Sequence, residues 1–130
     1  MIQPNQINLD AALTELTALF AAYETALMRN DITTLDQLFW PSSLTVRFGT
    51  SENLYGIEAI RAFRNVRNTD TLKRVLHRSQ ITTYGEDFAT TTTEFIREDQ
   101  LLGRQSQTWV RFPEGWRVVS AHISLNQEIA

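Results

Sequence analysis

The sequence predicts an α+β fold in which three N-terminal helices pack on one face of a strongly curved antiparallel sheet. Apolar residues recur at helical spacing in the first half of the chain, and long segments of the second half alternate between apolar and polar residues. Helices followed by a run of strands are typical of folds whose helices gather on one side of an antiparallel sheet. We expect one domain covering residues 1–130, because this length is close to the commonest domain size.

Three segments predict the helices. Residues 11–30 place apolar side chains three and four positions apart, which is the period of an amphipathic helix. A second, shorter helix is predicted over 33–40, with Pro41 as its stop signal. Residues 57–67 predict the third helix, directly after Gly56.

Five segments predict the strands. The first is 43–49, between the second and third helices, and the others are 72–84, 87–98, 101–113 and 115–125. Glycine, proline and aspartate lie between the last four segments, so we expect long antiparallel hairpins there.

Charge and composition exclude several classes of protein. The formal net charge is −3, whereas binding to nucleic acid through its phosphates needs a basic surplus. No apolar run approaches the length of a membrane-spanning helix, and the first ten residues lack the pattern of a signal peptide. We therefore expect a cytoplasmic protein that binds neither nucleic acid nor membranes.

The sequence predicts no metal and no other cofactor. It contains no cysteine, which excludes disulfides and thiol chemistry. Its two histidines, His77 and His122, are too few for a zinc site by themselves, and no acidic loop of the calcium-binding type accompanies them.

An arginine in the first predicted strand is the first candidate functional residue. In segment 43–49, Arg47 alternates with Val46 and Phe48, so it lies on the polar face of the strand. On a solvated sheet face this guanidinium would have no particular role. If the same face lines a cavity, Arg47 becomes a candidate receptor for an anion.

Several long segments resemble the AtzH-like family, which includes HpxZ-type proteins and belongs to the NTF2-like (SnoaL-like) superfamily. The resemblance runs from about Ala22 to Leu125, in the order of the family. The segments are YETALMRND, LDQLFW, TVRFGTSENLYGIEAIRAFR, ITTYGEDFAT and GRQSQTWVRFPEGWRVVSAHISL. The resemblance implies an NTF2-like cone, whose sheet wraps around the long first helix and leaves a pocket between them.

The same resemblance implies an activity and a catalytic pair. Members are associated with the catabolism of ureides and triazine-derived compounds. It implies a decarboxylating amidohydrolase that converts 1,3-dicarboxyurea to allophanate, or an accessory in oxalurate breakdown. The family's tyrosine on the first helix and arginine on the first strand match Tyr23 and Arg47.

General chemistry is consistent with this pair. A dicarboxylated urea is a small planar dianion, and an arginine guanidinium offers paired donors that match a carboxylate. When a carboxylate leaves, the urea nitrogen needs a proton, which a phenol beside a cation could supply. The alternative for Tyr23 is a purely structural aromatic residue on the apolar stripe of the helix.

Further residues are candidates for binding the substrate. The aromatic ones are expected to line the pocket, and Tyr55 among them could act as a lid. Arg61 and Arg64 could form a second carboxylate clamp, or could lie on the wet side of their helix. His122 could move protons, or could be a structural residue. The full set is Trp40, Phe48, Tyr55, Arg61, Phe63, Arg64, Gln107, Trp109 and His122.

Alternation along the last two strands predicts which of their polar residues share a face. Covered polar groups need partners, so we expect one of these faces to line the pocket. On segment 101–113 one face carries Gln105, Gln107, Trp109 and Arg111, and the other carries Ser106 and Thr108. On segment 115–125 one face is predicted to carry Trp116, Val118, Ser120, His122 and Ser124.

Two other functions remain open from the sequence. An isomerase or cyclase of the ketosteroid-isomerase type would use an aspartate or histidine base and an apolar ligand, but Asp87 and Asp99 lie in predicted turns. A non-catalytic accessory in ureide catabolism would bind a ligand or a partner enzyme. We also expect a homodimer, because apolar residues alternate on both faces of the late strands.

Overall fold

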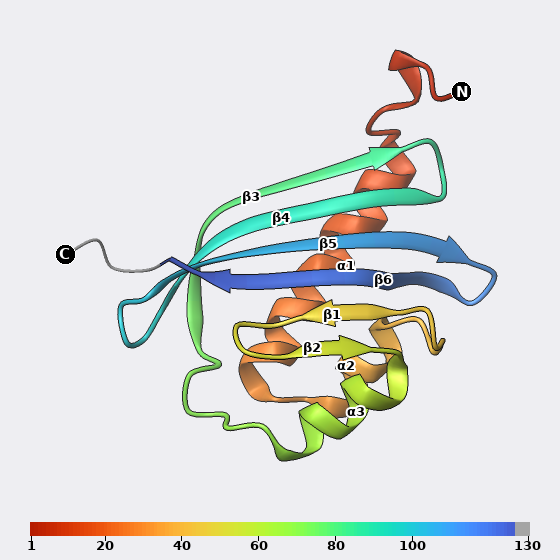
Figure 1. The fold of residues 1–130 in the computed structure, drawn as a ribbon. Helices are drawn as coiled ribbons and strands as arrows, with labels where there is room; N and C mark the ends of the chain where they lie inside the picture. Colours follow the sequence, from red (N-terminus) through yellow and green to blue (C-terminus); the bar gives the residue numbers. More distant parts are fainter. Residues whose placement is uncertain (127–130) are drawn as a thin grey trace.

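The computed structural model describes residues 1–126 and contains three α-helices and one six-stranded sheet (Figure 1). A short 3₁₀ helix, η1, precedes them. In chain order the elements are η1 (Pro4–Gln6), α1 (Asp10–Arg29), α2 (Ile32–Leu38), β1 (Val46–Phe48), β2 (Asn53–Tyr55), α3 (Ile57–Val66), β3 (Arg74–Tyr84), β4 (Phe88–Arg97), β5 (Leu102–Phe112) and β6 (Gly115–Leu125). The α+β class and the helix and strand order agree with the prediction, except that η1 and β2 were not predicted.

The second helix ends earlier than its sequence predicts. Asp31 caps its start, because the Asp31 carboxylate accepts a hydrogen bond from the Thr34 backbone N–H at 3.2 Å. The helix ends at Leu38, and Phe39 is extended and forms a β-bridge with Val118 of β6. Pairing with the sheet therefore ends this helix before Pro41 is reached.

The sheet has the strand order β2-β1-β6-β5-β4-β3. Four of its pairings are antiparallel, and three of these are the predicted pairings among the late strands β3 to β6, but β1 runs parallel to β6. This pair joins strands from the two halves of the chain, so no tight hairpin forces it to be antiparallel. Figure 1 shows α1 crossing behind β3 to β6, with α2 and α3 next to the edge formed by β1 and β2.

The hydrophobic core lies between α1 and the inner face of the sheet, meaning the face toward the helices. It is formed by buried aliphatic and aromatic side chains, which remove apolar surface from water. Its members include Ala12, Leu16, Tyr23, Leu27, Leu35, Leu38, Phe39, Ile57, Ile60, Ala89, Trp109, Trp116, Val118 and Ala121.

In β1, the inner face is the polar one. Thr45, just before the strand, and Arg47 are buried, whereas Val46 and Phe48 are half-buried and Leu44 is 72% exposed. This is the reverse of the usual alternation, in which apolar residues face the core. The interpretation of Arg47 as a residue on a solvated sheet face is therefore wrong.

An extra residue in β6 changes which side chains face inward. Thr108 of β5 pairs with Ser120, but the next residue, Trp109, pairs with Val118, so Val119 is unpaired. Such a bulge shifts the alternation by one residue. Trp116 and Val118 face inward before the bulge, and Ala121 and Ile123 face inward after it. The prediction that Ser120, His122 and Ser124 share the face of Trp116 is therefore wrong.

Within residues 1–126, no helix combines the length and the apolar character needed to cross a membrane. The homodimer stays a prediction, since the structure contains one chain.

Candidate functional site

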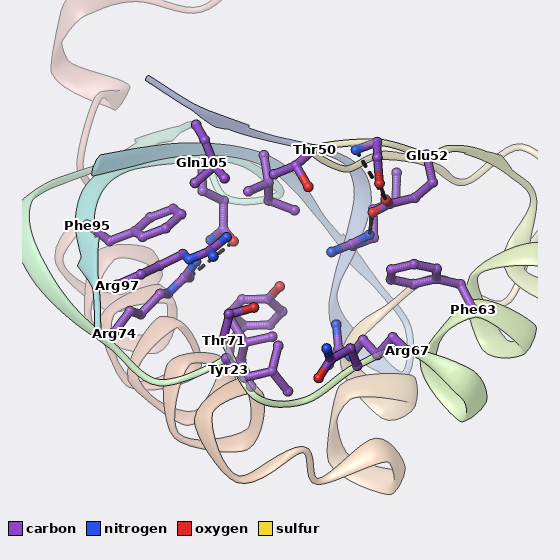
Figure 2. A pocket seen from close by; sticks show the side chains of 17 residues that line it. Tyr23, Thr50, Glu52, Phe63, Arg67, Thr71, Arg74, Phe95, Arg97 and Gln105 are labelled. Carbon is purple, nitrogen blue, oxygen red and sulfur yellow. Dashed lines mark hydrogen bonds and ion pairs between the residues drawn. The ribbon is translucent and has the colours of Figure 1, made fainter. Parts of the chain in front are cut away.

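A cavity of about 300 Å³ lies between α1, the end of α3 and the inner face of the sheet (Figure 2). It opens to solvent, and both charged and apolar side chains line it. Those residues are Tyr23, Leu27, Arg47, Thr50, Ser51, Glu52, Phe63, Arg67, Asn68, Thr71, Leu72, Arg74, Phe95, Arg97, Gln105, Ile123 and Leu125.

Tyr23 lies between the two ends of this cavity. Its ring packs in the core against Phe39, with ring centres 6.3 Å apart. Figure 2 shows its hydroxyl pointing into the cavity. Within residues 1–126 this hydroxyl makes no hydrogen bond. Tyr23 is therefore both a core aromatic and a free phenol in the cavity.

Arg47 reaches the cavity from β1 and is held by Glu52. The Arg47 Nη1 donates to Glu52 Oε1 at 3.1 Å, and Ser51 donates to the other oxygen of the same carboxylate. The guanidinium also lies 5.2 Å from the ring centre of Phe63. Its Nε is buried and has no partner among the described residues. One edge of Arg47 is thus occupied by a carboxylate from its own chain.

The position of Glu52 depends on a glycine. A Cβ at Gly49 would lie 1.5 Å from Glu52 Oε1, so a larger residue there would push the carboxylate away from Arg47. The close approach explains the glycine better than conformational freedom does, because its φ is not positive.

Two further arginines add positive charge beside Arg47. Arg67 lines the cavity and donates to Asn30 Oδ1 at 3.2 Å, and Arg64 lies nearby with its guanidinium 4.2 Å from the ring centre of Phe39. Neither forms an ion pair within residues 1–126. We call this part of the site, formed by Arg47, Glu52, Phe63 and Arg67 with Arg64 beside it, the cationic end.

The pKa values of these two arginines reflect their burial. The pKa of Arg64 is lowered to about 10, mainly by desolvation; the charges of Arg47 and Arg67 act in the same direction, while Tyr23 and Asp36 oppose the shift. Desolvation also lowers the pKa of Arg67, and the charge of Arg47 acts in the same direction. Arg47 is thus paired with Glu52, whereas Arg64 and Arg67 form no ion pair within residues 1–126, and a bound anion would supply the missing negative charge.

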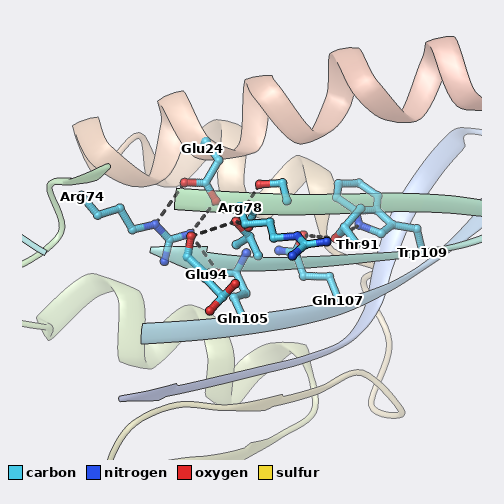
Figure 3. A network of polar contacts seen from close by, with 10 residues as sticks. Glu24, Arg74, Arg78, Thr91, Glu94, Gln105, Gln107 and Trp109 are labelled. Atoms are coloured by element: carbon cyan, nitrogen blue, oxygen red, sulfur yellow. Dashed lines mark hydrogen bonds and ion pairs between the residues drawn. The ribbon is translucent and has the colours of Figure 1, made fainter. Parts of the chain in front are cut away.

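The opposite end of the cavity has matched charges. Arg74 of β3 donates through Nε to Glu24 Oε2 at 3.0 Å and through Nη2 to Glu24 Oε1, and both side chains are buried (Figure 3). Arg97 is ion-paired with Asp99. We call this part of the site, formed by Arg74, Phe95, Arg97 and Gln105, the amide end; Figure 2 shows its residues across the cavity from Glu52, Phe63 and Arg67.

The amide end owes its shape to a glycine in β5. Phe95 lies over Gly103, where a Cβ would come within 2.1 Å of the ring. The Arg74 guanidinium lies 4.2 Å from the centre of the same ring. Only glycine at 103 therefore lets Phe95 both line the cavity and pack against Arg74.

Among the residues predicted from the sequence, Tyr23, Arg47 and Phe63 line this one cavity. They come from α1, β1 and α3, so the fold gathers them from three elements. The other eight predicted residues lie elsewhere.

Four predicted aromatic residues lie away from the cavity, and each has another packing partner. Trp40 stacks on Phe112, because the alternation after α2 turns Phe39 inward instead. Phe48 packs edge-on against Tyr55 and His122 on the outer face. Tyr55 is 68% exposed on edge strand β2.

Trp109 is fully buried and serves the core. Its Nε1 donates to Thr91 Oγ1 at 3.1 Å, and Thr91 donates to Gln107 Oε1 at 3.0 Å (Figure 3). Gln107 is therefore part of a buried network below α1 and does not line the cavity.

The remaining polar candidates are also placed outside the cavity. Arg61 pairs with Asp36 at 2.7 Å and with Glu58 at 3.1 Å, on the half-exposed side of α3. Arg64 is buried beside Phe39 and acts on the cavity only through its charge. His122 is exposed on the outer face, because the bulge at Val119 turns it away.

Several lining residues were not predicted as site residues. Alternation along β5 placed Gln105 on a candidate face, but nothing in the sequence separates it from Gln107. Arg67 follows the last residue of α3, where the helical period gives no information about its direction. Arg74 and Glu52 are surface-type residues in the sequence, and their burial depends on partners in distant elements.

No cluster of three or more histidine, aspartate or glutamate side chains that could hold a metal ion occurs in the part of the chain from residue 1 to 126.

Comparisons with known proteins show which family the chain belongs to. Its residues 5–129 match the AtzH-like family. A protein of unknown function from the DUF3225 family of Pectobacterium atrosepticum is 51% identical, with a TM-score of 0.95 over 98% of this chain and 100% of the other. A cystatin-like fold protein from Burkholderia xenovorans is 44% identical, with a TM-score of 0.90 over 95% and 98%.

A more distant likeness gives the superfamily. An NTF2-like superfamily protein from Salmonella enterica serovar Typhimurium is 26% identical, with a TM-score of 0.74 over 92% of this chain and 94% of the other. No functionally curated protein is similar enough to match. The family match covers nearly the whole chain, and the structural likeness agrees with the predicted cone. The chain belongs to the AtzH-like family and has the NTF2-like fold.

Proposed function

We propose that the protein is a cofactor-independent decarboxylating amidohydrolase that acts on an N-carboxylated urea, converting 1,3-dicarboxyurea to allophanate, or on a related ureide such as oxalurate. The observation that carries this proposal is the free Tyr23 hydroxyl in a cavity that Arg47 also lines. A phenol beside guanidinium groups can protonate a ligand whose anionic group they hold. Membership of the AtzH-like family supports the same chemistry.

The proposed step balances with one proton. The carbon–nitrogen bond to one carboxylate of the dicarboxyurea dianion breaks, and its electron pair stays on nitrogen while carbon dioxide leaves. Tyr23 Oη gives its proton to that nitrogen, which yields the allophanate anion. The phenolate regains a proton from water, because the cavity opens to solvent.

Arg47 and Arg67 hold the carboxylate that the product keeps. Glu52 occupies Arg47 Nη1, so the ligand uses the remaining donors of Arg47 or displaces Glu52. A guanidinium–carboxylate pair opposes loss of that carboxylate, because decarboxylation would remove the charge that the guanidinium holds. The carboxylate that leaves is therefore the one farther from Arg47.

The charge that proton donation leaves on Tyr23 also has a counter-charge. Tyr23 is among the groups that raise the pKa of Arg64, so the two side chains lie close enough to interact electrostatically. The buried Arg64 would thus support the reaction without touching the ligand.

One observation favours a second candidate, a non-catalytic accessory that binds ureides. Arg47 is already ion-paired with Glu52, so the cavity as it stands is suited to exchange one carboxylate for another. The isomerase or cyclase alternative is less favoured. None of the described lining residues is an aspartate or histidine, and the one lining carboxylate, Glu52, is ion-paired.

The test is formation of allophanate from 1,3-dicarboxyurea by purified wild type and variants. Tyr23→Phe keeps the ring in the core and removes only the hydroxyl, so it should lower kcat about a hundredfold or more and leave the thermal unfolding midpoint unchanged. Arg47→Lys loses the paired donors and should raise KM. Tyr55→Phe is the matched control, because Tyr55 lies outside the cavity.

Two results would contradict the proposal. If Tyr23→Phe turns over as fast as wild type, the phenol is a packing residue and not an acid. If wild type binds ureides but decarboxylates none of them, the accessory function is correct.

A further inference from the structure

We propose that Gln105 binds the second carboxylate of the ligand, the one that leaves, and so makes the cavity select ligands with two anionic ends over ligands with one. This inference rests on the proposed function for the class of ligand. It assigns the amide end as the place where carbon dioxide is formed and identifies Gln105 as the specificity-determining contact there.

The side-chain amide of Gln105 has a donor group without a partner. Gln105 is 2% exposed and lines the cavity. Its Oε1 accepts a hydrogen bond from Arg74 Nη2 at 3.2 Å, whereas its Nε2 is buried and has no partner among residues 1–126. A buried donor left unpaired destabilises a protein, and the unpaired donor of Gln105, unlike that of Gln107, belongs to a residue that lines the cavity.

Arg74 fixes which way this amide faces. A guanidinium has only donors, so the amide oxygen must be the atom that faces Arg74. Arg74 itself is held by two hydrogen bonds to Glu24 (Figure 3). The amide cannot turn over without placing its NH₂ group against the guanidinium. The NH₂ group of Gln105 is thereby left without an acceptor among the described residues, on a side chain that lines the cavity.

Gln105 lies across the cavity from the cationic end. Strand β6 separates β1, which carries Arg47, from β5, which carries Gln105. Two strand spacings amount to roughly 10 Å, and the register places Gln105 opposite Ile123, two residues along β6 from Ala121, the partner of Arg47. The phenol of Tyr23 lies between the two ends in Figure 2. A small ligand can therefore meet Arg47 and Gln105 with different ends.

The charges of the two ends suit the two carboxylates differently. The guanidinium groups at the amide end, Arg74 and Arg97, are each matched by a carboxylate of the chain. A carboxylate bound there meets a neutral amide donor without an unmatched cation. Its charge can therefore move onto the urea nitrogen and Tyr23 with less electrostatic cost than at the cationic end.

The experiment measures binding of two stable probes by titration calorimetry. Glutarate is a dianion with as many chain atoms as 1,3-dicarboxyurea, and butyrate is a monoanion with as many as allophanate. Wild type should bind glutarate more tightly than butyrate. Gln105→Met should weaken glutarate binding roughly tenfold or more and leave butyrate binding unchanged.

Gln107→Met is the matched control. Gln107 lies on the same strand and face, is also 2% exposed, and also has an unpaired Nε2, but it does not line the cavity. Its substitution should change binding of neither probe. If Gln105→Met fails to fold, Gln105→Glu keeps the shape and the bond to Arg74 but removes the donor, and it should weaken glutarate binding even more.

The possible results separate this inference from the proposed function. Equal losses for both probes, no loss for glutarate, or no binding of glutarate by wild type would overturn the inference. Selectivity for glutarate that depends on Gln105 would support it even if Tyr23→Phe showed the protein to be non-catalytic. If turnover depends on Tyr23 but the selectivity for glutarate is absent, this inference is wrong and the proposed function stands.

Discussion

At the cationic end of the cavity, Arg47 is paired with Glu52 but Arg64 and Arg67 form no ion pair within residues 1–126, whereas at the amide end Arg74 and Arg97 each have a carboxylate partner. Both ends contain arginine, and both are partly or wholly buried. They differ in how the charge is balanced. The cationic end has a surplus that only a ligand can neutralise, and the amide end is neutral before any ligand arrives.

This difference separates two uses of arginine that look the same in a sequence. An ion-paired arginine such as Arg74 organises its neighbours and fixes the amide of Gln105. An unmatched one such as Arg67 raises the free energy of the empty protein and lowers that of the complex, because desolvation is offset only when an anion binds. Removing charges from the two ends should therefore have opposite effects on stability.

The largest effect on stability is expected from Glu24→Gln. This change leaves Arg74 buried without its carboxylate, and breaking a buried pair in this way destabilises proteins by about 3–5 kcal/mol. Arg74 and Glu24 side chains are only 5% and 6% exposed, so solvent cannot compensate. Urea unfolding followed by circular dichroism measures the free energy of unfolding.

Asp99→Asn is the control for that measurement. It also removes the carboxylate partner of an arginine at the amide end, but this carboxylate lies in the turn after β4 and is 39% exposed. Its substitution should leave the free energy of unfolding almost unchanged. Equal effects of the two substitutions would show that burial of the Arg74–Glu24 pair is not what stabilises the amide end.

The next effect concerns Arg67→Met at the cationic end. It removes one unmatched cation from the cavity wall, so glutarate should bind about ten- to a hundredfold more weakly. The free energy of unfolding should not fall, because the variant no longer buries this charge. Calorimetry and urea unfolding measure the two quantities. Arg97→Met, which removes a matched cation, should cause a smaller loss of affinity; a larger loss there would contradict the comparison.

Most of the fold could be predicted from the sequence, because its elements follow local rules. The long helix and the four late strands have clear periods, and their bounds agree to within a few residues. The parallel pairing of β1 and the short strand β2 could not be predicted, since both depend on contacts between distant segments. The bulge at Val119 leaves no mark in the sequence pattern, yet it decides that His122 faces outward.

The site could be predicted only in part, for a related reason. Tyr23 and Arg47 were found through the family resemblance, and the strand alternation alone gave Arg47 two open readings. The aromatic candidates were chosen as a type of residue, and Trp40, Phe48, Tyr55 and Trp109 each pack elsewhere. Whether an arginine is matched by a carboxylate depends on side chains far away in the sequence, as Glu24 and Arg74 illustrate.

The smallest effect is a change of stability with pH that depends on Arg64. Its pKa is lowered to about 10 by desolvation, against an ordinary value of 12.5. Below pH 10 the group is charged in both folded and unfolded chains, and burying that charge destabilises the fold. As the pH rises through 10, the folded protein loses the proton while the unfolded chain keeps it, so this destabilisation diminishes.

Arg64→Met removes this titration, so the comparison with wild type isolates it from the other groups that titrate at high pH. The free energy of unfolding of the variant, minus that of wild type, should fall by about 1 kcal/mol between about pH 9 and about pH 11. Arg61→Met on the same helix is the control, because Arg61 is ion-paired and half-exposed. A difference that stays constant over this range would mean that Arg64 keeps its proton in the folded protein. In that case Tyr23 and Phe39 would compensate for most of the desolvation of Arg64, although no carboxylate is ion-paired with it within residues 1–126.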